Sequence, residues 1–238
     1  MKILKRIKNN IPNTITCINL IAGVVAIILA SKGNCELNGL PAYQWAYIFI
    51  GIGALADFFD GFSARLLSAY SNLGKELDSL CDLVTFGVAP AIILFNAVLD
   101  NGGSEWVAWT ALFIPVCGAL RLAKFNVDDR QTSSFIGLPI PANAIFWIGF
   151  TAMYYGIGNI SAWIVILSIF IIGDLMLSSI KMYSLKFSDW SFRNNVMRYS
   201  LIIAAIMFVI TSGLSGLMWL IIYYVISSVG LNRRANIA

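Results

Sequence analysis

Four aspartates lie in one short stretch of the sequence, between two apolar segments; residues 57–82 read DFFDGFSARLLSAYSNLGKELDSLCD. Asp57 and Asp60 are three residues apart, so they share one face of a helix. Asp78 and Asp82 are four residues apart and also share a face. Carboxylate oxygens are the ligands that Mg²⁺, Mn²⁺ and Ca²⁺ prefer. The pattern predicts a site for a hard divalent cation, or for a pair of them, which would suit displacement at phosphorus.

The composition places these aspartates in a membrane protein. Of 238 residues, 59% are hydrophobic and 12% are charged, whereas about 25% are charged in an ordinary soluble domain. We expect a single all-α integral membrane domain over residues 1–238, a bundle of about eight transmembrane helices of roughly 20 residues each. The expected spans are 11–30, 42–66, 76–98, 105–126, 140–156, 160–181, 196–212 and 214–230.

The basic residues fall mostly on one side of these spans. The segment Lys2–Lys8 holds four basic residues and no acid, and of the other basic residues only Lys32 falls on the opposite side. Cytoplasmic loops carry an excess of Lys and Arg. We therefore expect both termini and the aspartates on the cytoplasmic face of the inner cell membrane. Lys2–Lys8 predicts either a short interfacial helix or a plain basic anchor, and the net charge of +4 predicts contact with anionic lipid and not with nucleic acid.

The aspartates need a physical reason to lie at the ends of membrane spans. An aspartate at a helix centre costs roughly 2.5–3.5 kcal/mol on insertion scales, and converging carboxylates also repel one another. One alternative to a metal site is simple pairing with Arg65, Lys75 and Arg121 at the membrane surface. Another is the ion pathway of a transporter. The outer halves of the spans hold almost nothing ionisable, which favours metal-assisted chemistry over transport.

The spacing of the aspartates and of nearby small residues resembles the signature of the CDP-alcohol phosphotransferase family. The shared pattern is Asp57-x2-Asp60-Gly61-x2-Ala64-Arg65-x8-Gly74-x3-Asp78-x3-Asp82. The resemblance implies transfer of a phosphatidyl-type group from a CDP-linked lipid to an alcohol, with release of CMP. It also implies divalent metal ions and commonly a homodimer.

The resemblance also implies roles for the charged residues of this hairpin. Asp57, Asp60 and Asp78 would hold the metal. Asp82 would be the general base on the acceptor hydroxyl and would also touch the second metal. Arg65 would reach the diphosphate, because its planar fork suits phosphate oxygens.

Small and polar residues complete the expected site for CDP-diacylglycerol. Asn13, Thr16 and Asn19 are three residues apart, so they form a polar stripe on the first span. This stripe would either meet the nucleotide or bond to another helix. Residues without bulk let the nucleotide, or a neighbouring helix, approach the backbone. The expected contacts are Asn13, Thr16, Gly61, Ala64, Arg65 and Gly74.

Later motifs bear on the acceptor alcohol. They are the segments 121–126 (RLAKFN), 135–142 (FIGLPIPA), 175–178 (LMLS) and 183–186 (YSLK). These segments resemble the bacterial phosphatidylserine synthase branch of the family, which implies L-serine as the acceptor. The branch usually has arginine where this chain has Lys124, which keeps the charge but not the bidentate fork.

A serine acceptor agrees with the charges at the cytoplasmic end of the fourth span. The serine carboxylate needs a fixed cation, which Arg121 and Lys124 would supply, and Asn126 could add a hydrogen bond. Anchoring of the span by its basic residues accounts for both cations equally well. Glycerol 3-phosphate, an inositol phosphate and an amino alcohol remain alternative acceptors. Asp174, deeper in the sixth span, has no assigned role.

Overall fold

A long helical hairpin, formed by the first two helices, carries the first half of the acidic stretch. A computed structural model describes residues 2–127, 135–183, 191 and 195–235. The first half of the chain contains α1 (Lys2–Ala30), β1 (Glu36–Leu37), β2 (Leu40–Pro41), α2 (Ala42–Leu67), α3 (Asn72–Asp82), η1 (Leu83–Val88), α4 (Ala89–Asp100), α5 (Glu105–Trp109), η2 (Thr110–Leu112) and α6 (Phe113–Val127). The remainder contains β3 (Phe135–Ile136), α7 (Ile140–Ile157), α8 (Ala162–Leu177), β4 (Lys181–Met182), α9 (Val196–Ser212), η3 (Gly213–Ser215) and α10 (Gly216–Ala235).

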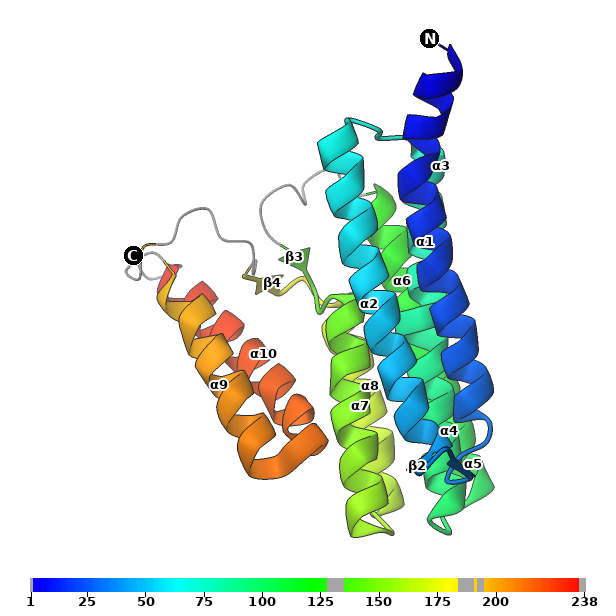
Figure 1. Ribbon diagram of the computed structural model, residues 1–238. Coiled ribbons are helices and arrows are strands. Elements are labelled where there is room, and N and C mark those ends of the chain that lie inside the picture. The colour runs from blue at the N-terminus through cyan, green and yellow to red at the C-terminus, as the bar shows by residue number, and fades with distance from the viewer. Residues whose placement is uncertain (1, 128–134, 184–190, 192–194, 236–238) are drawn as a thin grey trace.

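The helices α1 to α8 stand side by side in one elongated bundle (Figure 1). Within the described residues, five helical stretches are long and apolar enough to cross a membrane: 10–30, 42–67, 72–100, 105–127 and 196–230. α8 is a shorter apolar helix. The prediction of an all-α integral membrane protein is therefore confirmed, whereas the number of crossings stays a prediction.

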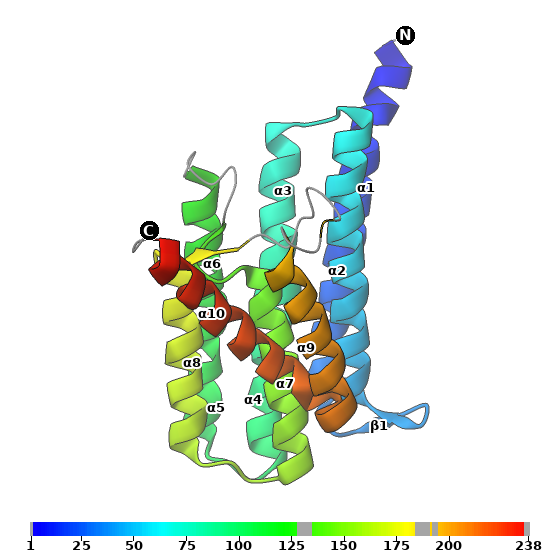
Figure 2. The same cartoon turned by 90° about the vertical axis from the view of Figure 1, so that its left-hand side faces the viewer.

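Each expected span overlaps a helix, but the boundaries differ: the expected sixth span reaches Lys181, whereas α8 ends at Leu177 and Lys181 lies in β4. The expected first span and the basic segment before it form one continuous helix, α1, whose first turns extend beyond the rest of the bundle (Figure 1). The third span is α3 and α4 joined by η1, a π-helical turn directly after Asp82. The apolar stretch 196–230 is folded into the antiparallel pair α9 and α10, connected by η3 (Figure 2).

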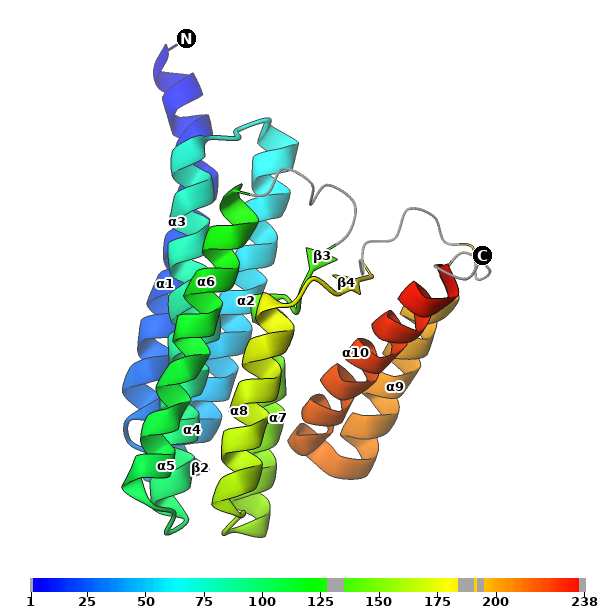
Figure 3. The same ribbon diagram turned by 180° about the vertical axis from the view of Figure 1, so that it is seen from behind.

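The α9–α10 hairpin leans away from the other helices and meets them mainly along α7 (Figure 3). The two helices approach closely at Gly149 of α7, where an added Cβ would overlap the backbone of Met218 in α10. Among the described residues, α9 buries none of its own side chains. Its apolar surface, with Ile203 and Ile210 more than half exposed, is therefore available to lipid or to another protein.

The end of the bundle farthest from the α2–α3 turn is tied together by Asp100 and tyrosines. The Asp100 carboxylate accepts hydrogen bonds from the Asn34 backbone N–H at 3.0 Å and from the Tyr155 hydroxyl at 2.8 Å. The Tyr155 ring stacks on the Tyr43 ring with centroids 3.8 Å apart. These contacts join the α1–α2 connection, α4 and α7. They fix the scaffold at one end, while the acidic stretch lies toward the other.

Candidate active site

The α2–α3 turn brings two halves of the acidic stretch together. α2 ends at Leu67, and α3 begins at Asn72 after the N-cap Ser71, whose hydroxyl accepts a hydrogen bond from the Gly74 N–H at 3.0 Å. Serine is a favoured N-cap because its oxygen satisfies an N–H that has no partner inside the helix. The cap fixes where α3 begins. α3 runs antiparallel to α2 (Figure 2), so Asp78 faces the aspartates of α2.

Three carboxylates converge at this place. Asp57 and Asp60 of α2 and Asp78 of α3 each offer one oxygen, and these oxygens all lie within 4.8 Å of one another. Oδ2 of Asp60 and Oδ1 of Asp78 are buried, and neither has a hydrogen-bond partner within the described ranges. Buried carboxylate oxygens without partners are costly. A divalent cation would satisfy both, so these residues fit the metal that the sequence predicts.

Asp82 lies one helical turn beyond Asp78 and does not belong to this converging group, as far as the described residues show. It is 8% exposed, and its Oδ1 accepts a hydrogen bond from Nδ2 of Asn19 in α1 at 3.2 Å. The sequence predicts Asp82 both as a base and as a metal contact. In this geometry its environment differs from that of the three converging carboxylates.

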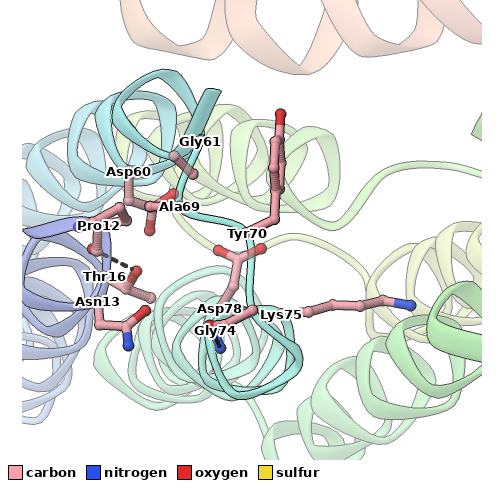
Figure 4. Close-up of a pocket in the computed structure, with 12 residues that line it drawn as sticks. Pro12, Asn13, Thr16, Asp60, Gly61, Ala69, Tyr70, Gly74, Lys75 and Asp78 are labelled. Carbon is pink, nitrogen blue, oxygen red and sulfur yellow. Dashed lines mark hydrogen bonds between the residues drawn. The ribbon is translucent and has the colours of Figure 1, made fainter. Parts of the chain in front are cut away.

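A pocket of about 210 Å³ opens beside the carboxylates. Asp60 and Asp78 face it from α2 and α3 (Figure 4). A Cβ at Gly61 would meet no described atom within 4 Å, whereas one at Gly74 would lie 3.0 Å from Oδ1 of Asn13. The structure gathers here most of the residues predicted to contact CDP-diacylglycerol: Asn13, Thr16, Gly61, Ala64 and Gly74.

Arg65, the remaining predicted contact, is directed elsewhere. Its side chain is exposed, and its Nε donates to the Gly61 carbonyl of its own helix at 3.0 Å. The rim of the pocket also includes Lys75, which the sequence offered only as an ion-pair partner of the aspartates, and Tyr70, which the sequence did not single out. Tyr70 is 73% exposed and stands at the rim in Figure 4. Its position inside the turn between the paired aspartates was the available signal.

The three residues predicted to bind serine contact three different parts of the protein. Arg121 is 7% exposed, and its Nε is buried without a hydrogen-bond partner among the described residues. Its Cζ lies 5.2 Å from the centroid of the Phe125 ring. The negative charge of Asp82 lies near enough to stabilise the positive charge of the Arg121 guanidinium. A buried guanidinium nitrogen without a partner is suited to receive an anion.

Lys124 and Asn126 contact elements other than their own helix. Lys124 Nζ donates to the Leu177 carbonyl at the end of α8 at 3.5 Å. Asn126 Nδ2 donates to the Ser79 hydroxyl in α3 at 3.0 Å, and the Asn126 carbonyl accepts from Lys75 Nζ at 2.8 Å. Arg65 and Lys75, two of the three basic residues in the pairing alternative, thus donate to backbone carbonyls, so the structure does not support simple pairing of the aspartates with these two side chains.

Comparisons with known proteins agree with this site. The CDP-alcohol phosphatidyltransferase family profile matches residues 9–172, which include the whole acidic hairpin. The chain is 42% identical over 133 residues to the CDP-diacylglycerol–serine O-phosphatidyltransferase of Bacillus subtilis, a match that covers 56% of this chain and 70% of that protein. It is 38% identical over 173 residues to the protein of the same name from Methanocaldococcus jannaschii, covering 72% of each chain. A Helicobacter pylori protein of that name is 32% identical over 189 residues, covering 76% of this chain and 75% of the relative. Because the matched region spans more than half of the sequence and contains every converging carboxylate, this chain belongs to the CDP-alcohol phosphatidyltransferase family.

Proposed function

We propose that this protein transfers the phosphatidyl group of CDP-diacylglycerol to the hydroxyl of L-serine, forming phosphatidylserine and CMP. The observation that carries this proposal is the pocket beside three converging carboxylates, with a buried arginine near a fourth. The similarity to relatives that carry the name of this activity supports the choice of serine.

The pocket suits the CDP part of the donor. Gly61 and Ala64 leave room for the nucleotide to approach α2, and Asn13 and Thr16 offer polar groups from α1. Arg65 would exchange its bond to the Gly61 carbonyl for the diphosphate oxygens, which match its fork.

The converging carboxylates of Asp57, Asp60 and Asp78 would hold Mg²⁺ or Mn²⁺, with Ca²⁺ as a further candidate. When bound, such a cation neutralises negative charge on the phosphoryl oxygens. The support for this assignment is that one buried oxygen of Asp60 and one of Asp78 have no hydrogen-bond partner in the part of the chain that the structure describes.

Asp82 would act as general base on the serine hydroxyl. Its Oδ1 is engaged by Asn19, so the proton would pass to Oδ2. The serine oxygen then forms a bond to the phosphatidyl phosphorus, and the bond from that phosphorus to CMP breaks with its electron pair leaving on CMP. Arg121 would hold the serine carboxylate. Lys124 and Asn126 would serve the serine site by fixing α6, which carries Arg121.

The activity is tested with purified protein in detergent, CDP-diacylglycerol, Mg²⁺ and a panel of acceptors, with CMP release as the readout. We expect serine to support the fastest release, and ethanolamine, glycerol 3-phosphate and an inositol phosphate to support little. Faster CMP release with glycerol 3-phosphate than with serine would support the phosphatidyl transfer but identify glycerol 3-phosphate as the acceptor. If no acceptor supports CMP release and the protein in vesicles shows cation-coupled uptake, the protein is a transporter and not an enzyme.

We also propose that the active site and both termini face the cytoplasm across the inner cell membrane, and that the protein is a homodimer. The distribution of basic residues supports the orientation, and the apolar surface of α9 leaves room for a second copy of the protein.

Reporter proteins fused at Asn101 are expected to lie on the outer side of the cell membrane. Fusions at Gln131, a residue outside the described ranges, are expected to be cytoplasmic. The reverse pattern at either position would contradict the orientation, and a monomeric mass in detergent would contradict the dimer.

A further inference from the structure

Asn19 lies on the polar stripe of α1 but does not join Asn13 and Thr16 at the pocket. The sequence predicts that it meets the nucleotide or another helix, together with Asn13 and Thr16. In the structure Asn13 and Thr16 line the pocket, whereas Asn19 is 0% exposed and donates its Nδ2–H to Oδ1 of Asp82. We propose that Asn19 is a positioning residue for Asp82: it holds one carboxylate oxygen so that the other faces the acceptor hydroxyl. This inference rests on the proposed function of Asp82 as the base.

The orientation of the Asn19 amide follows from the chemistry of its neighbour. An ionised carboxylate only accepts hydrogen bonds, so the amide nitrogen and not the amide oxygen must face Asp82. The amide oxygen then points toward α2, where it is buried and has no hydrogen-bond partner among the described residues. A buried acceptor without a partner costs free energy. A purely structural side chain at this place would be better apolar, so the presence of an amide indicates that its donor serves Asp82.

A second hydrogen bond fixes the α1 backbone at the same level. The hydroxyl of Thr85, also 0% exposed, donates to the Asn19 carbonyl at 3.0 Å. Thr85 lies in η1, the π-helical turn that begins directly after Asp82. π-helical turns inside α-helices are frequent at functional sites. The pair of bonds therefore ties α1 to the segment that carries Asp82, at Asp82 itself and three residues beyond it.

Two glycines make the space for this arrangement. A Cβ at Gly53 of α2 would lie 2.6 Å from Cγ2 of Thr85 and 2.9 Å from Oδ1 of Asn19. A Cβ at Gly23 of α1 would overlap the Thr85 hydroxyl. The three segments can meet only because these positions lack side chains. Such close packing restricts the Asn19 side chain to few conformations. A side chain that orients a catalytic carboxylate must be held in place in this way.

The decisive variant is Asn19→Leu, which keeps a similar volume and removes the donor. We expect kcat for CMP release to fall about 10- to 150-fold, the range for a lost hydrogen bond to a charged group. The KM values for serine and for CDP-diacylglycerol should stay within about threefold of the parent, because Asn19 is wholly buried and does not line the pocket. The Mg²⁺ concentration for half-maximal activity should also stay unchanged.

Asn143→Leu is the matched control, since it removes another wholly buried asparagine that bonds to the same segment. Asn143 Nδ2 donates to the Phe86 carbonyl of η1 at 2.9 Å, and no hydrogen bond joins Asn143 to Asp82 in the described part of the chain. This variant should unfold at a lower temperature but keep the parent kcat per folded protein. If Asn19→Leu does not fold, Thr85→Val decides, with an expected fall in kcat of about fivefold for one lost neutral hydrogen bond and unchanged KM values.

The double variant Asn19→Asp with Asp82→Asn exchanges the donor and acceptor of the bond. It should fold and remain inactive, because the carboxylate has moved to α1.

Three results would overturn the inference. Asn19→Leu with the parent kcat and a raised KM for CDP-diacylglycerol would assign Asn19 to the nucleotide. A raised Mg²⁺ requirement would show that it acts through metal binding. Parent kcat and KM with only lowered stability would leave it a packing residue. Failure of the proposed function is distinct, since the parent itself would then release no CMP with serine.

Discussion

Asp60→Asn is expected to abolish CMP release while the protein stays folded in detergent. The substitution keeps the shape of the side chain but removes a charged oxygen from a place where Oδ2 is buried and has no hydrogen-bond partner among the described residues. Losing one ligand of a catalytic cation costs several kcal/mol of transition-state stabilisation, so a fall of more than about 100-fold is expected. Asp57→Asn and Asp78→Asn should have the same effect, because their oxygens converge with that of Asp60.

Thermal unfolding separates metal loss from misfolding. Mg²⁺ should raise the unfolding temperature of the parent, because a ligand that binds only the folded state stabilises it. The three variants should lack this shift. In chelator they should be at least as stable as the parent, because one of the mutually repelling charges has been removed.

Asp100→Asn is the matched control, because this carboxylate bonds to Asn34 and Tyr155 at the far end of the bundle. It should keep both CMP release and the Mg²⁺ shift. Excess chelator should abolish CMP release by the parent protein, and added Mg²⁺ or Mn²⁺ should restore that activity. Full activity in excess chelator would exclude the carboxylates as a metal site.

Arg121→Ala is expected to raise the KM for serine about 10- to 150-fold, the range for a lost charge-assisted hydrogen bond at a buried place. The KM for CDP-diacylglycerol should change far less. The physical reason is the buried Nε without a described partner, which a serine carboxylate would satisfy. Arg121→Lys should recover only part of the affinity, because an ammonium lacks the bidentate fork.

Two comparisons sharpen this experiment. Lys124→Ala removes a neighbouring cation that donates to the Leu177 carbonyl, so its effect on the serine KM should be smaller. Ethanolamine, which is serine without the carboxylate, should be used no worse by Arg121→Ala than by the parent. If Arg121 instead holds the diphosphate, the substitution will depress turnover with every acceptor equally, and Arg121 must be removed from the serine site.

Much of the scaffold follows from the sequence because its causes are local. Runs of apolar residues set where the helices lie, and each expected span overlaps a helix, although the sixth extends beyond the end of α8 at Leu177. The spacing of Asp57 and Asp60 places them on one face of α2 through helical periodicity alone. The short connection to α3 then makes the two helices antiparallel, so the meeting of these aspartates with Asp78 could also be predicted.

Only the tertiary structure decided how the helices are rotated against one another. Periodicity places Asn19 on the same stripe as Asn13 and Thr16, yet Asn19 bonds to Asp82 while the other two line the pocket. Asp82 likewise shares a face with Asp78 but lies outside the converging group in the described structure.

The same limit applies to α6, where neighbouring polar residues diverge. Arg121 is buried near Asp82, whereas Lys124 reaches the end of α8 and Asn126 bonds to α3. Helical periodicity predicts which side chains share a face of a helix, but not which neighbouring helix that face contacts. Close approaches between distant segments make that choice, as at Gly53, where only a missing Cβ lets α2 approach Asn19 and Thr85.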